Sequence, residues 1–191
     1  MIKSLLLFTS LFFVTAVSLN IDVDTEASQV SWKGYKVTGS HEGTIAVKSG
    51  NIEFTDGEFT GGSFMLDMTT LKATDISGGS AAKLEGHLKS GDFFGVEKFP
   101  TAFLKITKVV SRGTPGDYRV TGDLTIKETT KTIRFNTTMA EEMGTYTAKA
   151  DLTIDRTDFD VRYGSGSFID NLGDKTIYDE FELGITLVYV K

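Results

Sequence analysis

Apolar and polar residues alternate through most of this chain. In KTIYDEFELGITLVYVK, residues 175–191, the residues two apart from Phe181 to Tyr189 are all apolar and share one face with Ile177. A period of two is typical of a β-strand with one buried face. The same alternation recurs in residues 117–127, 130–140 and 145–155, which follow one another closely. The pattern therefore predicts an antiparallel meander toward the C-terminus.

Further strands are predicted upstream of this meander. They cover residues 28–39, 43–49, 51–59, 62–68 and 101–110, and glycines interrupt them at positions 39, 43, 50, 57, 61 and 62, where we expect turns and bulges. About eight strands, with only two prolines in the chain, predict an all-β fold: an extended antiparallel β-barrel, which leaves no sheet edge exposed. A two-sheet sandwich is the alternative.

One segment has a helical period instead. In SAAKLEGHLKSG, residues 80–91, the apolar residues Ala81, Leu84 and Leu88 fall on one stripe, and Ser80 and Gly91 suit the two ends of a helix. We expect one short helix around residues 81–90, inserted between strands. The next segment, GDFFGVEKFP, carries three phenylalanines and ends at Pro100, which excludes helical geometry at the residue before it. It is predicted to lie across one end of the barrel.

The N-terminus has the features of a secretory signal. Lys3 precedes an uncharged apolar run from Leu5 to Val17, and small residues follow at Ala16 and Ser18. The run is shorter than the roughly 20 residues that cross a bilayer, so no transmembrane span is expected in the mature chain. We predict a cleaved signal peptide at residues 1–18, a single domain at residues 19–191, and a periplasmic or secreted protein.

Composition narrows the functional classes. The formal net charge is −6 and the charges are scattered along the chain. This argues against a nucleic-acid partner, because nucleic-acid-binding proteins usually show a basic face. The chain contains no cysteine, so a secreted form must be held by its core without disulfides.

Candidate catalytic chemistry is sparse. His41 and His87 are the only histidines; His87 suits a half-buried helix position with one hydrogen bond, and His41, in TGSHEGT, suits either a turn cap or a contact to a head group. Asp155 and Asp158 are interpreted as charge partners of Arg156. The loop of residues 163–176 matches no nucleotide or calcium motif and is a candidate lining for a barrel mouth. We therefore predict no catalytic residue, no metal site and no cofactor.

Four segments carry a further signal: KLEGHLKSGDFFGVEKFPTAFLKI, WKGYKVTGSHEGTI, VTGDLTIKETTKTIRF and DRTDFDVRYGSG. The first is similar to the hallmark segment of the YceI-like family of secreted bacterial polyisoprenoid-binding proteins. The other three resemble segments of that family in the same order. The resemblance implies a lipocalin-like barrel whose long pocket holds polyprenyl chains, polyprenyl diphosphates, quinones or fatty-acid derivatives. It also implies ligand-binding roles for a set of residues around the turn and the helix: His41, Leu84, His87, Leu88, Phe93, Phe94 and Phe99.

The predicted function is that of a secreted carrier or sequestering protein for a long-chain isoprenoid or related amphiphile, without catalysis. Trp32 and Phe64 are further candidates for the pocket wall. The expected partner is an isoprenoid, a quinone or a fatty-acid-like molecule, and a homodimer is left open. Two alternatives remain: a hydrolase of lipids or glycans that uses His41 or His87, and a ligand-free interaction protein whose barrel is filled by its own side chains.

Overall fold

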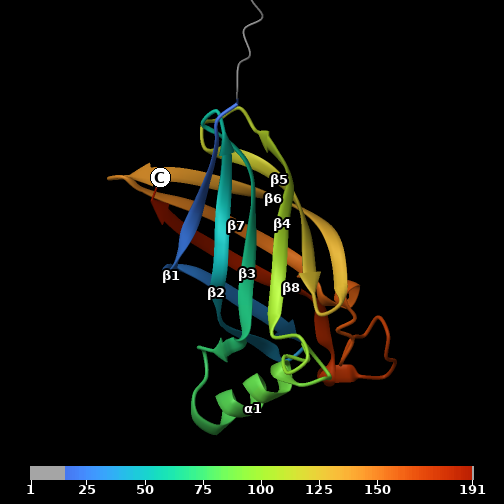
Figure 1. Cartoon of the computed structure of the whole chain (residues 1–191). Helices are drawn as coiled ribbons and strands as arrows, with labels where there is room; N and C mark the ends of the chain where they lie inside the picture. The colour runs from blue at the N-terminus through green and yellow to red at the C-terminus, as the bar shows by residue number, and fades with distance from the viewer. Residues whose placement is uncertain (1–15, 191) are drawn as a thin grey trace, which may run out of the picture.

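The computed structural model describes residues 16–190, which fold into one β-barrel with a helix beneath it (Figure 1). The predicted signal peptide, residues 1–18, lies almost entirely outside the described residues. Eight strands build the barrel: β1 (Ser18–Lys36), β2 (Gly39–Thr55), β3 (Glu58–Ala73), β4 (Thr101–Ser111), β5 (Asp117–Ile126), β6 (Thr129–Glu142), β7 (Thr145–Asp155) and β8 (Ile177–Val190).

The strands form a closed antiparallel barrel in sequence order. Each strand pairs with the next, and β1 closes the ring by pairing with β8, for example Trp32 opposite Leu183. The predicted barrel of about eight strands is thus confirmed, and the sandwich alternative is wrong. Closure pairs the strand edges that an open sheet would leave available for aggregation.

The period-two pattern determines which side chains reach the interior. In β7, Ala148, Ala150, Leu152 and Ile154 are buried, whereas the residues between them are exposed. A register slip by one residue would move this whole set to the solvent face, so the alternation fixes the register strongly.

Two glycines within β2 have a different role from the predicted one. The turn between β2 and β3 is at Asp56 and Gly57, both with positive φ, so residues 51–59 are not a single strand. A Cβ on Gly43 would collide with the Lys72 carbonyl oxygen of β3 and come within 2.7 Å of the Trp32 indole, and one on Gly50 would come within 2.6 Å of the Phe64 ring. These glycines allow close approach of the neighbouring strand and leave room for the rings.

Helix α1 (Gly78–Lys89) lies across one end of the barrel, between β3 and β4 (Figure 1). It begins two residues before the predicted Ser80, and Ser77 and Ser90 occupy its cap positions in place of Ser80 and Gly91. Gly78, at the start of α1, adopts a φ of 63° that side chains disfavour. The Ala73 N–H donates to the Glu85 carboxylate at 3.0 Å and ties α1 to the end of β3.

The opposite end of the barrel is filled by aromatic side chains, which we call the aromatic plug. They come from strand ends remote from α1, and neighbouring ring centroids lie 5.3–6.2 Å apart: Phe54, Phe59, Tyr118, Tyr146 and Tyr189. Such spacings are typical of favourable aromatic pairs. The barrel therefore has one end covered by a helix and the other filled by packed rings.

Burial makes the stability contributed by Tyr189 depend on pH in the alkaline range. The side chain is 2% exposed, and burial, helped by Tyr146 and Tyr118, raises its pKa to about 12. Because the folded pKa exceeds the unfolded value of 10.0, this contribution to stability is complete below pH 10 and is lost as pH rises toward 12. Ionisation of Tyr189 should lower the free energy of unfolding of the native protein by up to about 2–3 kcal/mol between these pH values. The Tyr189→Phe variant should lack this decrease, and urea unfolding measures both. If the stability of Tyr189→Phe depended on pH as that of the native protein does, Tyr189 would not be the group responsible.

Candidate functional site

A cavity of about 280 Å³ lies between α1 and the barrel, and we call it the helix-end cavity. Its walls come from the strand ends next to α1, from the helix itself and from the segment that follows the helix. Apolar and aromatic side chains dominate the lining, including Trp32 of β1, Leu71 of β3, Leu84 and Leu88 of α1, and Leu183 of β8. Largely apolar concavities of this kind are the usual sites for small apolar ligands.

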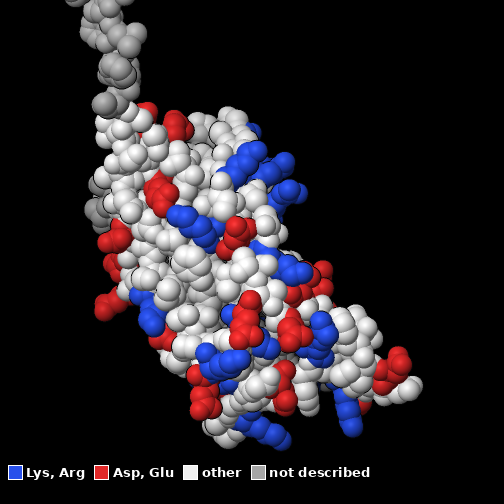
Figure 2. Space-filling view, turned by 45° about the vertical axis from the view of Figure 1, so that its right-hand side comes forward, with Lys and Arg blue, Asp and Glu red and all other residues white. Residues whose placement is uncertain are grey.

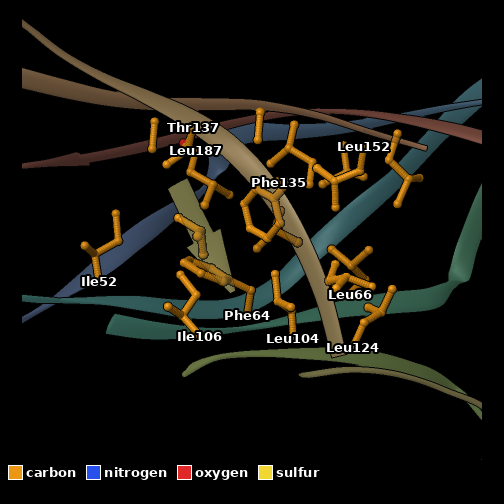
Figure 3. Close-up of a pocket in the computed structure, with 18 of the residues that line it drawn as sticks. Ile52, Phe64, Leu66, Leu104, Ile106, Leu124, Phe135, Thr137, Leu152 and Leu187 are labelled. Carbon is orange, nitrogen blue, oxygen red and sulfur yellow. The ribbon is translucent and has the colours of Figure 1, made fainter. Parts of the chain in front are cut away.

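A second cavity of about 80 Å³ lies in the middle of the barrel, and we call it the middle cavity (Figure 3). Among the described residues of its lining, Thr137 is the only one with a polar side chain. Phe64, Leu104 and Phe135 point into it although they are only partly buried, so the interior is not filled completely. Leu183 lines both cavities and therefore lies between them.

The aromatic segment after α1 closes the helix-end cavity on one side. Gly95 has a φ of 56°, and its N–H donates to the Ser90 carbonyl at 2.8 Å, which folds the segment back onto the helix end. This turn buries Phe93 to 4% exposure and leaves Phe94 half-buried, with its ring centroid 6.4 Å from that of Phe181. The segment does lie across a barrel end, as predicted.

His87 packs between two aromatic rings. Its ring centroid lies 4.9 Å from Phe93 and 4.6 Å from Tyr163, both in edge contacts. The predicted half-burial of His87 is confirmed. Its side chain makes these ring contacts in place of the expected hydrogen bond. Tyr163 thereby brings the loop of residues 163–176 against the helix.

Arg156 ties the end of the short 3₁₀ helix η1 (Arg156–Phe159) to the start of β8. It is 4% exposed and donates to the carbonyls of Val161, Ile177 and Tyr178 at 2.7–3.0 Å. Its guanidinium also pairs with Asp179 at 3.3 Å. The guanidinium therefore makes four hydrogen bonds inside the protein.

The acidic neighbours of Arg156 in sequence are not its salt-bridge partners. Asp155 accepts a bond from the Thr157 N–H at 2.8 Å, and Asp158 pairs with Lys131 at 3.2 Å. The predicted pairing is wrong for Asp158, because η1 turns its carboxylate toward β6. Asp155 caps η1 instead of forming a salt bridge, but its charge still opposes the lowering of the Arg156 pKa by burial. Burial alone would raise the pKa of Asp179, but hydrogen bonds from Ser165 and Ser167 and the charge of Arg156 hold it below its usual value.

His41 forms a pair with Asp75 at the rim of the helix-end cavity. Its Nδ1 lies 2.8 Å from the Asp75 carboxylate, which also accepts the Glu42 N–H at 3.3 Å. Burial would raise the pKa of Asp75, but these two hydrogen bonds outweigh it and hold that pKa below its usual value. A carboxylate only accepts, so Nδ1 of His41 carries the proton in this contact.

The structure places the predicted site residues in three locations. Seven of them line the helix-end cavity: Trp32, His41, Leu84, His87, Leu88, Phe93 and Phe94. Phe64 lines the middle cavity. Phe99 lines neither; it packs near Gly95, with the Lys98 ammonium 4.8 Å from its ring centre. Their contacts to a ligand stay predictions.

Other lining residues were not singled out from the sequence. Phe181 and Leu183 were assigned to the inner face of the last strand, but no signal showed that this face continues into a cavity. Leu71 lies beyond the residues predicted for its strand. The indole Nε1 of Trp32 is buried without a hydrogen-bond partner among residues 16–190.

Within residues 16–190, no helix has the length and apolar character needed to cross a membrane. In the same part of the chain, no three histidine or acidic side chains are gathered where they could hold a metal ion.

A closed eight-stranded antiparallel barrel with an apolar cavity under a single helix defines a lipocalin-like barrel. The YceI-like domain family matches residues 22–189, and the chain belongs to that family. It is 33% identical over 119 residues to a UPF0312 protein of Vibrio parahaemolyticus, and the match covers 58% of each chain, so it spans little more than half of that relative.

Solved structures share the fold. BcnA of Burkholderia cenocepacia superposes with a TM-score of 0.70 at 24% identity, over 87% of this chain and 98% of that one. A polyisoprenoid binding domain from Saccharophagus degradans, implicated in plant cell wall breakdown, gives a TM-score of 0.60 at 14% identity, over 88% and 97%. At these identities the likeness shows the fold alone.

Proposed function

We propose that this chain is an exported binding protein that carries or sequesters a long-chain isoprenoid or related amphiphilic lipid, without catalysis. The observation that carries the proposal is the pair of apolar cavities, one on either side of Leu183, in the barrel and beneath its helix. The polyisoprenoid binding named for the Saccharophagus domain supports the same ligand class.

Burial of an apolar tail is sufficient to drive such binding. A tail that buries about ten methylenes at about 0.8 kcal/mol each gains about 8 kcal/mol before the costs of ordering it. The lining offers this kind of surface, because Thr137 is the sole polar side chain among the described residues around the middle cavity. No strong ion pair with the ligand is needed.

The two cavities suggest the direction in which a tail would lie. The aromatic plug closes the end remote from α1, so the tail would pass Phe93, Phe94 and Leu88 and point toward Leu183. The head group would then remain near His41 and the strand ends. The segment GDFFGVEKFP would serve both as core and as one wall of the ligand site.

The His41 and Asp75 pair resembles an oriented general base, but the rest of a hydrolytic site does not accompany it. Among the described residues, no hydroxyl side chain is hydrogen-bonded to either histidine ring, and a base of this kind needs a nucleophile within hydrogen-bond reach. The geometry therefore favours binding over hydrolysis.

Lipid extraction tests the proposed function. The full chain, purified from its native host without detergent, should release an apolar lipid in near-stoichiometric amount on solvent extraction, as measured by mass spectrometry. The lipid-free protein should take up added polyprenyl ligands. Absence of both co-purified lipid and uptake would reject the proposal. Cell fractionation and the mass of the mature protein test export and cleavage.

A further inference from the structure

Five of the ten large apolar side chains that are exposed within residues 16–190 lie at the α1 end of the barrel. They come from the β1–β2 turn, the loop of residues 163–176 and the start of β8, and we call them the exposed apolar patch: Val37, Tyr163, Phe168, Ile169 and Tyr178. Backbone hydrogen bonds join these segments, from the Val37 N–H to the Thr176 carbonyl and from the Ile177 N–H to that of Gly164. In Figure 1 the loop projects from the barrel beside α1. Apolar side chains that cluster on a surface indicate a site of interaction.

Phe168 and Ile169 are held outward by the structure of the loop. The N–H groups of both residues donate to the carbonyl of Ser165, at 3.2 and 2.9 Å, and Ser165 itself is fully buried. The Ser167 hydroxyl donates to the Asp179 carboxylate at 2.6 Å, which ties the same turn to β8. An anchored turn therefore presents the two apolar side chains to the outside, at 52% and 44% exposure.

The exposed apolar patch continues into the lining of the helix-end cavity. Tyr178 belongs to both, and Tyr163 packs against His87, which is part of the lining. Next to Tyr163 in the chain, the exposed Arg162 places its guanidinium 4.5 Å from the centre of the Phe168 ring. An apolar molecule could thus move between a partner on the patch and the cavity along apolar side chains.

The size of the patch favours a lipid surface over a second protein chain. A stable protein interface takes about 20–30 residues from each partner, whereas the patch consists of five side chains. Insertion into a membrane interface needs only a small apolar surface, and tyrosine rings suit the level of the lipid head groups.

The charges beside the patch show which kind of lipid surface it suits. Residues 160–176 contain three aspartates against one arginine and one lysine. On the face that Figure 2 shows, lysines and arginines are interspersed with acidic side chains and do not gather into one basic patch. Attraction to anionic lipids requires clustered basic residues. The charge balance therefore favours a zwitterionic surface, which is bound through apolar contact.

We propose that the exposed apolar patch docks the α1 end of the protein on a zwitterionic lipid bilayer, with Phe168 and Ile169 inserted at the level of the head groups. The proposal rests on the proposed function, because it supplies the route by which a membrane lipid enters or leaves the helix-end cavity. Insertion of so few side chains gives weak, reversible binding. A carrier needs this property, because it must leave the membrane together with its ligand.

A dye on a single cysteine tests the insertion, because the chain has no other cysteine. Ile169→Cys and Val110→Cys carry the dye at positions that are 44% and 46% exposed, and Val110 lies near the end of β4 remote from α1. With phosphatidylcholine vesicles, the emission of an environment-sensitive dye should shift to the blue at position 169 and stay unchanged at position 110. An equal response at both positions, or none at either, would overturn the proposal.

A charge placed in the patch tests the apolar contact. Ile169→Asp should lower the fraction of protein that floats with the same vesicles by about tenfold, because a carboxylate resists transfer out of water. Val110→Asp is the matched control and should change it by less than about twofold. Raising the salt concentration should leave the binding of the native protein unchanged. Equal effects of the two variants, or loss of binding in salt, would contradict docking through the patch.

Uptake of prenyl alcohols separates the docking from the proposed function. Ile169 does not line the helix-end cavity, so Ile169→Asp should bind farnesol added from water as the native protein does. It should take up an octaprenyl alcohol from phosphatidylcholine vesicles about fivefold or more slowly than the native protein. Equal rates of uptake would overturn the docking and leave the carrier function intact. Failure of the native protein to bind either alcohol would count against the carrier function itself.

Discussion

Replacement of Arg156 by methionine should lower the free energy of unfolding by about 3–5 kcal/mol, because removal of one partner from a buried ion pair leaves the other charge uncompensated. The guanidinium satisfies the carbonyls of Val161, Ile177 and Tyr178 and pairs with Asp179. Methionine fills similar volume but donates nothing. Urea unfolding followed by circular dichroism measures the loss.

An exposed arginine nearby provides the control. Arg162 pairs with Asp160 at 3.4 Å, and both side chains are more than half exposed. Arg162→Met should therefore cost less than about 1 kcal/mol, as is usual for surface ion pairs. Similar losses in the two variants would show that the buried hydrogen bonds of Arg156 do not stabilise the junction between η1 and the start of β8.

Leu183→Phe should lower the affinity for an octaprenyl alcohol by about 100-fold and leave that for the shorter farnesol within about threefold. Leu183 lines both cavities, so a larger ring there should prevent a long tail from reaching the middle cavity. Loss of about four buried methylenes at about 0.8 kcal/mol each accounts for the effect. Competition against Trp32 fluorescence measures both affinities.

Leu19→Phe is the matched control, because it adds the same ring at a side chain that is 45% exposed, at the start of β1. It should leave both affinities unchanged. An equal loss of both ligands in Leu183→Phe would indicate a collapsed site, and an unchanged octaprenyl affinity would show that the tail takes another path. A circular dichroism spectrum establishes that each variant is folded.

The sequence predicts the barrel well because one physical rule governs most of it. Strand β7 buries every second residue from Ala148 to Ile154, and this alternation can be read from the sequence without tertiary information. The prediction fails locally in β2, where Gly43 and Gly50 were expected to mark turns or bulges between separate strands. A glycine that makes room for a ring on a neighbouring strand looks the same in sequence as a glycine in a turn.

The candidate site could likewise be predicted only where its residues are close together in the sequence. Leu84, His87, Leu88, Phe93 and Phe94 come from one continuous segment, and the sequence places them together because the helix and its turn are local. The pairs His41 with Asp75 and Arg156 with Asp179 join residues 34 and 23 positions apart. Which carboxylate meets which base depends on loop geometry between strands, and neither period nor composition encodes it.

The aromatic plug gives the barrel a blind end. If the chain binds a lipid as proposed, a tail that enters beside α1 would not emerge near Tyr189, and its last carbon would stop at a fixed depth with its head group at the rim. Chains longer than this depth would leave methylenes in water, and shorter ones would leave the middle cavity unfilled. Such a site would select for molecular length, because the distance between plug and rim would set the number of isoprene units that fit best.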